Sequence, residues 1–227
     1  MAFHNVIISS GHLTDKPDRP APRFPESKAD AVRDQISRQL SAWSVGPGDL
    51  AICGGARGSD IIFAELCADR GAEVWLFISL GAEDFLEQSV RVPGTDWEQR
   101  FNALRRRGGV KTIGPDQEAP ASTAPAIGSS ASPVPAMGSP ASPAPASTAP
   151  ASPAPASQSP TSSPFERANI RMIDTAKAQA SSQDHLYAIL VWDEMPSGDG
   201  PGGTADFAER VKDAGGRVAV INPRGLS

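Results

Sequence analysis

Short apolar runs alternate with segments of helical spacing along most of the chain. The runs cover residues 3–9, 50–53, 73–79, 110–113, 185–192 and 217–221. Several are apolar at nearly every position, which is typical of parallel strands covered on both faces. Between them, apolar residues recur every three or four positions, as at Val32, Ile36 and Leu40, and this spacing predicts amphipathic helices.

The segments with helical spacing complete a regular alternation of elements. They cover residues 26–43, 60–70, 83–90, 96–107, 164–180 and 204–214. Ser59 is predicted to cap the second of them, because a serine hydroxyl at that position can accept a first-turn amide. Strands alternating with helices predict an α/β fold, a Rossmann-like three-layer sandwich with a mostly parallel sheet.

One long stretch breaks this pattern. Residues 119–164 are almost entirely Ala, Pro, Ser, Thr and Gly, without a charged or aromatic side chain. Such a composition buries too little apolar surface to offset the entropy of ordering, which predicts a disordered linker over 116–164. The linker is interpreted either as a solvated spacer or as a ligand for proline-binding modules. Residues 1–115 and 165–227 are then two parts of one domain.

Charge and apolar content narrow the function classes. The formal net charge is −5, so bulk nucleic-acid binding is not expected. No signal peptide and no membrane span is predicted, which favours a cytoplasmic protein. Cys53 and Cys67 are expected to be reduced core residues, and the three histidines lack metal-ligand spacing, so no metal is predicted. The sequence leaves open whether the protein forms a homodimer.

Two glycine-rich turns carry the candidate chemistry. Residues 53–60 read Cys-Gly-Gly-Ala-Arg-Gly-Ser-Asp, and residues 198–206 read Gly-Asp-Gly-Pro-Gly-Gly-Thr-Ala-Asp. Each turn follows a predicted strand and precedes a predicted helix, where unpaired amides and the helix dipole favour a phosphate. Right-handed crossovers bring both turns to the carboxyl edge of the sheet, so we expect them to hold one nucleotide or sugar phosphate.

Each residue type in the turns suggests a role, although ligand-free strand-to-helix connections are the alternative. Arg57 offers a bidentate phosphate contact, while Asp60 repels phosphate and suits a ribose hydroxyl. Thr204 is interpreted as a helix cap, a phosphate donor or both, and Asp193 as a ribose ligand. The predicted binding residues of the turns are Gly54, Gly55, Ala56, Arg57, Gly58, Ser59, Asp60, Asp193, Gly200, Pro201, Gly202, Gly203 and Thr204.

The proline-rich loop after the first strand is a third candidate region. His12 and Asp15 are hypothesised to act as acid and base, and Phe24 to stack on a base. Arg19 and Arg23 are hypothesised to clamp a phosphate. The alternative is a polar surface loop with Phe24 packed on the body. The predicted binding residues here are Ser10, Gly11, His12 and Arg23.

The two glycine motifs resemble those of the SLOG superfamily. That group includes lonely-guy-type phosphoribohydrolases, lysine-decarboxylase-like proteins, the DNA-processing protein A family and nucleotide sensors of bacterial conflict systems. The resemblance covers about residues 3–113 and 165–222. It implies a Rossmann-like sheet that binds a nucleotide or nucleotide-derived ligand, with the two turns as phosphate loops.

One departure from this superfamily bears on catalysis. Its phosphoribohydrolases carry Pro-Gly-Gly-x-Gly-Thr-x-x-Glu, whereas here Thr204 follows Gly203 directly and Phe207 stands where the glutamate is expected. The leading hypothesis is therefore a sensor or effector module for an ADP-ribose-, NAD- or cyclic-nucleotide-like ligand, without a required cofactor. A nucleoside-monophosphate phosphoribohydrolase and an interaction scaffold are the alternatives. The catalytic candidates would be Asp15, Asp60, Asp193 and Asp206.

Overall fold

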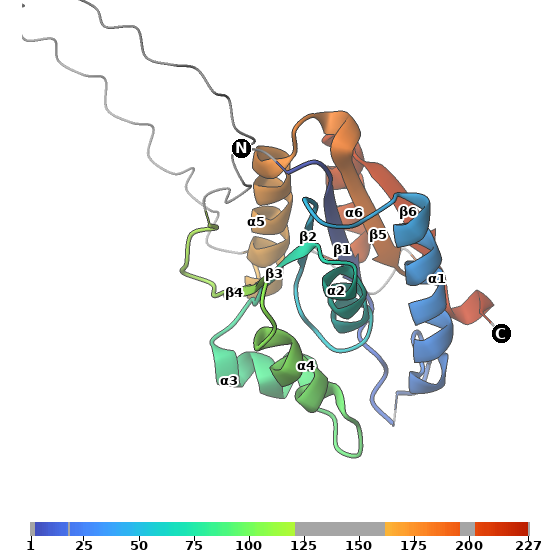
Figure 1. The fold of residues 1–227 in the computed structure, drawn as a ribbon. Coiled ribbons are helices and arrows are strands. Elements are labelled where there is room, and N and C mark those ends of the chain that lie inside the picture. The colour runs from blue at the N-terminus through green and yellow to red at the C-terminus, as the bar shows by residue number, and fades with distance from the viewer. Residues whose placement is uncertain (1–2, 18, 121–161, 196–202, 227) are drawn as a thin grey trace, which may run out of the picture.

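Six parallel strands form one sheet, which confirms the predicted α/β fold. The computed structural model describes residues 3–17, 19–120, 162–195 and 203–226, so most of the predicted linker lies outside the described residues. The strand order is β4-β3-β2-β1-β5-β6 (Figure 1). The strands are β1 (Val6–Gly11), β2 (Leu50–Cys53), β3 (Glu73–Phe77), β4 (Val110–Ile113), β5 (Leu186–Val191) and β6 (Arg217–Ile221).

Helices cover both faces of this sheet. The helices α1 (Ala29–Ala42), α2 (Ser59–Asp69) and α4 (Trp97–Arg105) pack on one face, and α5 (Pro164–Gln179) and α6 (Thr204–Asp213) pack on the other (Figure 1). Successive side chains of β1 feed the two cores in turn, because side chains along a strand alternate between faces. Ile7 belongs to the core under α1 and α2, and Ile8 to the core under α5.

The chain reverses its direction across the sheet beside β1. From β1 it adds β2, β3 and β4 on one side, and after α5 it returns to add β5 and β6 on the other. The registers Val6↔Leu50 and Val6↔Leu186 place β1 between strands from the two ends of the chain. Loops leave such a switch point toward opposite faces, and this opens a crevice at the carboxyl edge.

The remaining elements differ in detail from the predictions. A 3₁₀ turn, η1 (Glu26–Lys28), precedes α1, and the predicted helix at 83–90 is α3 (Ala82–Phe85) followed by a π-helical turn, η2 (Leu86–Val90). Short 3₁₀ turns η3 (Gln183–His185) and η4 (Pro223–Gly225) flank the last two strands. No helix in the described part of the chain is long and apolar enough to cross a membrane.

The prediction that Ser59 caps α2 is wrong. The N-cap residue is Gly58, at φ 85° and ψ −122°, and the Ser59 hydroxyl instead donates to the His12 carbonyl oxygen (3.2 Å). A Cβ on Gly58 would lie 2.7 Å from the Thr14 amide nitrogen. The loop after β1 therefore packs directly on the start of α2, and this contact takes the serine hydroxyl away from the helix.

Both cysteines are buried and unpaired, which confirms their expected place in the core. Burial raises the pKa of the Cys53 and Cys67 thiols, since the charged thiolate loses its solvation. These thiols therefore act as small apolar side chains.

Candidate functional site

A cavity of about 610 Å³ opens at the carboxyl edge of the sheet. It is lined by the end of β1 and its loop, the first glycine turn, the end of β3 with α3 and η2, and the first turns of α5 and α6. Cavities of this size hold small organic ligands, and this one lies at the switch point where open parallel sheets bind them. The fold and the cavity thus define an α/β protein with a ligand-sized crevice.

Most of the predicted binding residues meet at this cavity. The predicted residues in its lining are Ser10, Gly11, His12, Asp15, Arg23, Gly54, Ala56, Arg57, Asp60, Gly203 and Thr204. Those outside its lining are Gly55, Gly58, Ser59, Asp193 and Asp206. Gly200, Pro201 and Gly202 lie outside the described residues. The start of α6 and the first glycine turn therefore share one cavity.

The amides of the first glycine turn are largely used within the protein. The Ala56 amide donates to Asp60 Oδ2 (3.3 Å), and the Arg57 amide donates to the Ser89 carbonyl oxygen (2.9 Å). A Cβ on Gly54 would lie 2.9 Å from the same Asp60 oxygen. The Asp60 carboxyl group thus occupies the position at which the sequence predicts a phosphate.

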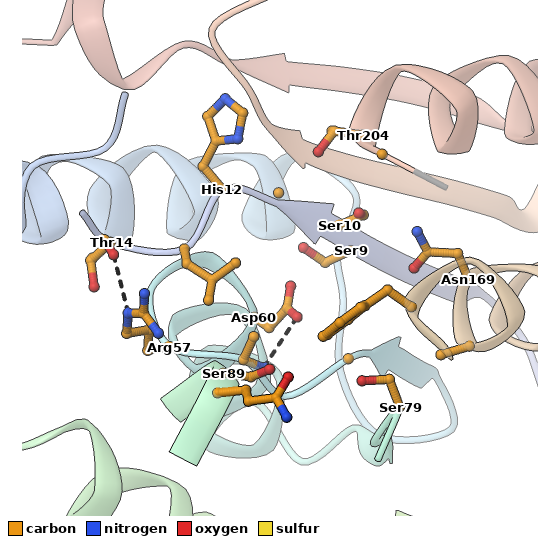
Figure 2. A pocket seen from close by; sticks show the side chains of 18 of the residues that line it. Ser9, Ser10, His12, Thr14, Arg57, Asp60, Ser79, Ser89, Asn169 and Thr204 are labelled. Carbon is orange, nitrogen blue, oxygen red and sulfur yellow. Dashed lines mark hydrogen bonds between the residues drawn. The ribbon is translucent and has the colours of Figure 1, made fainter. Parts of the chain in front are cut away.

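Asp60 is also the carboxyl group at the centre of the cavity (Figure 2). The residue is 7% exposed, and burial raises its pKa to about 7, although nearby amides of the turn favour the charged form. Asp60 Oδ1, Ser9 Oγ and Ser79 Oγ are buried without a hydrogen-bond partner among the described residues. Buried polar atoms are costly to leave unpaired, so a ligand with hydroxyl groups would fit here.

His12 and Asp15, the hypothesised acid and base, are each held by other partners. His12 Nε2 lies 2.9 Å from Asp193 Oδ1 instead, and the His12 amide donates to the Val191 carbonyl oxygen (2.8 Å). Asp15 Oδ2 accepts the amides of Arg23 and Phe24, at 2.8 and 2.9 Å. Asp15 is therefore used to close the loop, and the loop delivers His12 to the end of β5.

Asp193 is a buried anion beside several cations. Its Oδ2 lies 3.6 Å from Arg23 Nε and 3.4 Å from Arg224 Nη2. Burial raises the pKa of this carboxyl group, but the hydrogen bond and charge of His12 and the charge of Arg23 outweigh burial, so the pKa falls below its ordinary value. Asp193 thus links the loop after β1 to the end of β5. It does not itself line the cavity.

Arg57 brings a buried positive charge to the cavity. Its Nε donates to the Thr14 carbonyl oxygen (3.1 Å; Figure 2), the residue is 5% exposed, and its Nη1 has no hydrogen-bond partner among the described residues. Burial lowers the pKa of Arg57, while Glu26 and Asp15 raise it. An anionic ligand group could pair with the Nη1 group.

Two further predicted roles are not supported by the side-chain positions. Phe24 is fully buried in the core under α1 and α2, which corrects the hypothesis that it stacks on a ligand base. Asp206 pairs with Arg210 along α6 (2.9 Å) and does not reach the cavity lining. The alternative interpretation of Phe24, packed on the body, is the one the structure shows.

Sequence reasoning missed one wall of the cavity, which α5 provides. Phe165, Ala168, Asn169 and Met172 line it at helical spacing. The apolar spacing of the sequence in this segment, at Ile170, Ile173, Ala176 and Ala180, instead indicates a different set of positions. A spacing of three and four identifies a face of a helix but does not tell whether that face packs in the core or lines a cavity. The sequence therefore contained the helix but not its role in the site.

Comparison with known proteins leaves this site to be interpreted from its own residues. No protein-family model and no curated protein matches the chain. The resemblance to the SLOG superfamily therefore rests on the two glycine motifs alone. The function of the site has to be inferred from its geometry.

Proposed function

We propose that the protein binds a nucleotide or a nucleotide-derived ligand, such as an ADP-ribose-, NAD- or cyclic-nucleotide-like molecule, as a sensor or effector module. The observation that carries this proposal is the cavity at the switch point, where buried oxygens of Ser9, Asp60 and Ser79 have no hydrogen-bond partner within the described ranges of the chain. A ribose presents hydroxyl groups that can pair with such oxygens. The ligand needs no cofactor to bind.

The start of α6 supports the same ligand class. Gly203 and Thr204 line the cavity, and the hydroxyl group of Thr204 can exchange a hydrogen bond with a polar group of the ligand. Thr204 is 6% exposed and belongs to the lining of the cavity, in which its side chain is labelled (Figure 2). The superfamily resemblance implies a phosphate loop at the same residues.

The residue three positions after Thr204 favours ligand binding over ligand hydrolysis. Phe207, which stands where the phosphoribohydrolases carry a glutamate, is fully buried in the core under α5 and α6. A side chain in this core cannot supply a carboxylate to the cavity. This supports a protein that holds its ligand without cleaving it.

Calorimetric titration with AMP, ADP-ribose, NAD and cyclic AMP tests the proposal. We expect at least one of these to bind saturably, and to raise the unfolding temperature because it binds the folded state; 100-fold excess over Kd adds about 2.7 kcal/mol. Asp34→Asn, an exposed change on α1, should leave this binding unaltered. Failure of all four ligands to bind would exclude the proposed function.

A phosphoribohydrolase is the second candidate, and Asp60 is the observation that favours it. A buried carboxyl group with a pKa of about 7 can exchange a proton near neutral pH, as a general acid or base does. Incubation with AMP should then release adenine, and Asp60→Asn should abolish the release. If AMP binds and stays intact over hours, this candidate is excluded and the sensor remains.

A further inference from the structure

We propose that the cavity holds its ligand in one orientation, with a planar ring against α5 and an anionic group at the loop after β1. This inference rests on the proposed function. It narrows the ligand class to molecules with a ring at one end, a phosphate at the other and hydroxyl groups between them.

The α5 wall has the properties of a ring-binding surface. Ala168 and Met172 are almost fully buried, at 6% and 2% exposure, whereas Phe165 at the start of the helix is 46% exposed. Phe77, from the end of β3, lies in the same lining. A large aromatic side chain exposed at the rim of an apolar wall offers a flat surface on which a base can stack. Asn169 supplies a polar group within this wall.

The opposite wall is cationic. Lys16, Arg19, Arg23 and Arg57 line the cavity from the loop after β1 and the first glycine turn, and they outnumber the carboxylate of Asp15, which lines the same wall 3.3 Å from Arg19 Nε. Lys16 and Arg19 are exposed, while Arg57 is 5% exposed and its Nη1 has no hydrogen-bond partner in the part of the chain that the structure describes. Guanidinium groups match the geometry of phosphate oxygens, so this wall suits a phosphate.

The two walls belong to opposite faces of the sheet. Met172 of α5 packs into one core, and Phe24 anchors the loop in the other. In Figure 2, Asn169 and Arg57 lie on opposite sides of Asp60. A ligand that contacts both walls must therefore pass Asp60.

The groups between the walls disfavour the reverse orientation. A phosphate against α5 would lie beside Phe165, Ala168 and Met172, whose apolar side chains offer it no hydrogen-bond donor. The first glycine turn is occupied by the Asp60 carboxyl group, which repels an anion when it is charged. Hydroxyl groups can instead pair with Asp60 and Ser9, and this leaves the loop for the phosphate.

Three probes separate the two ends of the ligand: adenosine, AMP and ribose 5-phosphate, each titrated by calorimetry. Phe165→Ala should weaken adenosine and AMP by roughly five- to a hundredfold, since stacking on an aromatic side chain is lost, and should leave ribose 5-phosphate unchanged. The double variant Lys16→Gln/Arg19→Gln should weaken AMP and ribose 5-phosphate by about tenfold or more and leave adenosine unchanged. All three positions are exposed, so these variants should fold.

Matched controls lie outside the cavity. Val220→Ala removes an exposed apolar side chain from β6, and Arg106→Gln/Lys177→Gln removes two exposed cations. Neither should alter any of the three affinities. Circular dichroism of each variant checks that the fold is retained.

Several outcomes would overturn the orientation while leaving the proposed function standing. One is that Phe165→Ala weakens ribose 5-phosphate but not adenosine, while the double variant weakens adenosine but not ribose 5-phosphate. Another is loss of phosphate affinity in Thr204→Val but not in the double variant, which would place the anion at α6. A third is AMP binding that neither variant changes. If the unmodified protein binds none of the three probes, nor any of the four ligands above, the proposed function fails and the orientation fails with it.

Discussion

Two buried aspartates at the carboxyl edge differ in pKa because their neighbours differ. Asp60 faces amides and unpaired hydroxyl groups, and burial raises its pKa to about 7. Asp193 lies beside His12, Arg23 and Arg224, and its pKa falls. The sequence proposed both residues as ribose ligands or catalytic groups. Only their partners, which come from distant parts of the chain, separate a group in the cavity from one in an ionic cluster.

The raised pKa of Asp60 predicts a pH dependence of stability. Between the ordinary value of 3.8 and about 7, the folded state keeps a proton that the unfolded state releases, so the Asp60 contribution to stability falls as pH rises through this range. At 1.36 kcal/mol per pKa unit, the contribution lost by pH 8 is at most about 4 kcal/mol. Asp60→Asn should remove this dependence, as measured by urea unfolding from pH 4.5 to 8.

The exposed substitution Asp34→Asn is the control, because it removes a carboxyl group without removing a buried one. If Asp60→Asn and Asp34→Asn show the same pH profile as the unmodified protein, the Asp60 carboxyl group is not perturbed in the folded state.

Among the elements, the loop after β1 and the start of α2 form one unit. Gly58 accommodates Thr14 at close range, Ser59 holds the His12 carbonyl oxygen, and Arg57 holds that of Thr14. The π-helical turn η2 completes the unit, since its Ser89 carbonyl oxygen accepts the Arg57 amide. Hydrophobic periodicity predicted the strand and the helix, but not the loop's position. That position depends on contacts between residues more than 40 positions apart.

Gly58→Ala should therefore destabilise the fold more than an alanine at an open glycine. Gly58 combines φ 85° and ψ −122° with a Cβ position 2.7 Å from the Thr14 amide nitrogen. Gly94, at φ 80°, has nothing within 4 Å and is the matched control. We expect a loss of about 2 kcal/mol or more for Gly58→Ala and about 1 kcal/mol for Gly94→Ala in urea unfolding. Equal losses of unfolding free energy in the two variants would mean that the loop after β1 moves aside for the new Cβ without destabilising the fold.

Across the whole molecule, the two ends of the chain join in one sheet around β1. The described residues that line the cavity come from four separate stretches of the chain, 9–23, 54–89, 165–172 and 203–204. The formal net charge is −5, yet the loop wall of the cavity carries Lys16, Arg19, Arg23 and Arg57. A cationic wall on an acidic protein attracts small anions locally without favouring a polyanion.

Replacement of residues 121–161 by a Gly/Ser segment of equal length tests the place of the alanine- and proline-rich tract. Because the described residues that line the cavity lie outside this tract, we expect AMP affinity and unfolding temperature to stay within about twofold and about 2 °C, respectively. Calorimetry and thermal unfolding measure the two quantities. A large fall in affinity would show that the tract contributes to the ligand site. Loss of a binding partner at unchanged affinity would favour the scaffold hypothesis instead.

Local sequence determined the elements of this protein, and the tertiary structure decided its site. Apolar runs such as residues 185–192 and helical spacing such as Val32, Ile36 and Leu40 act over a few positions, so pattern alone predicted the strands, the helices and their alternation. Whether Asp60 or a phosphate fills the first glycine turn, and whether His12 meets Asp15 or Asp193, depends on which distant atoms arrive there. The hydrogen bonds and the burial of these side chains follow no periodicity along the chain. Only the tertiary structure decides them, because the sheet brings the carboxyl ends of strands from distant parts of the chain together.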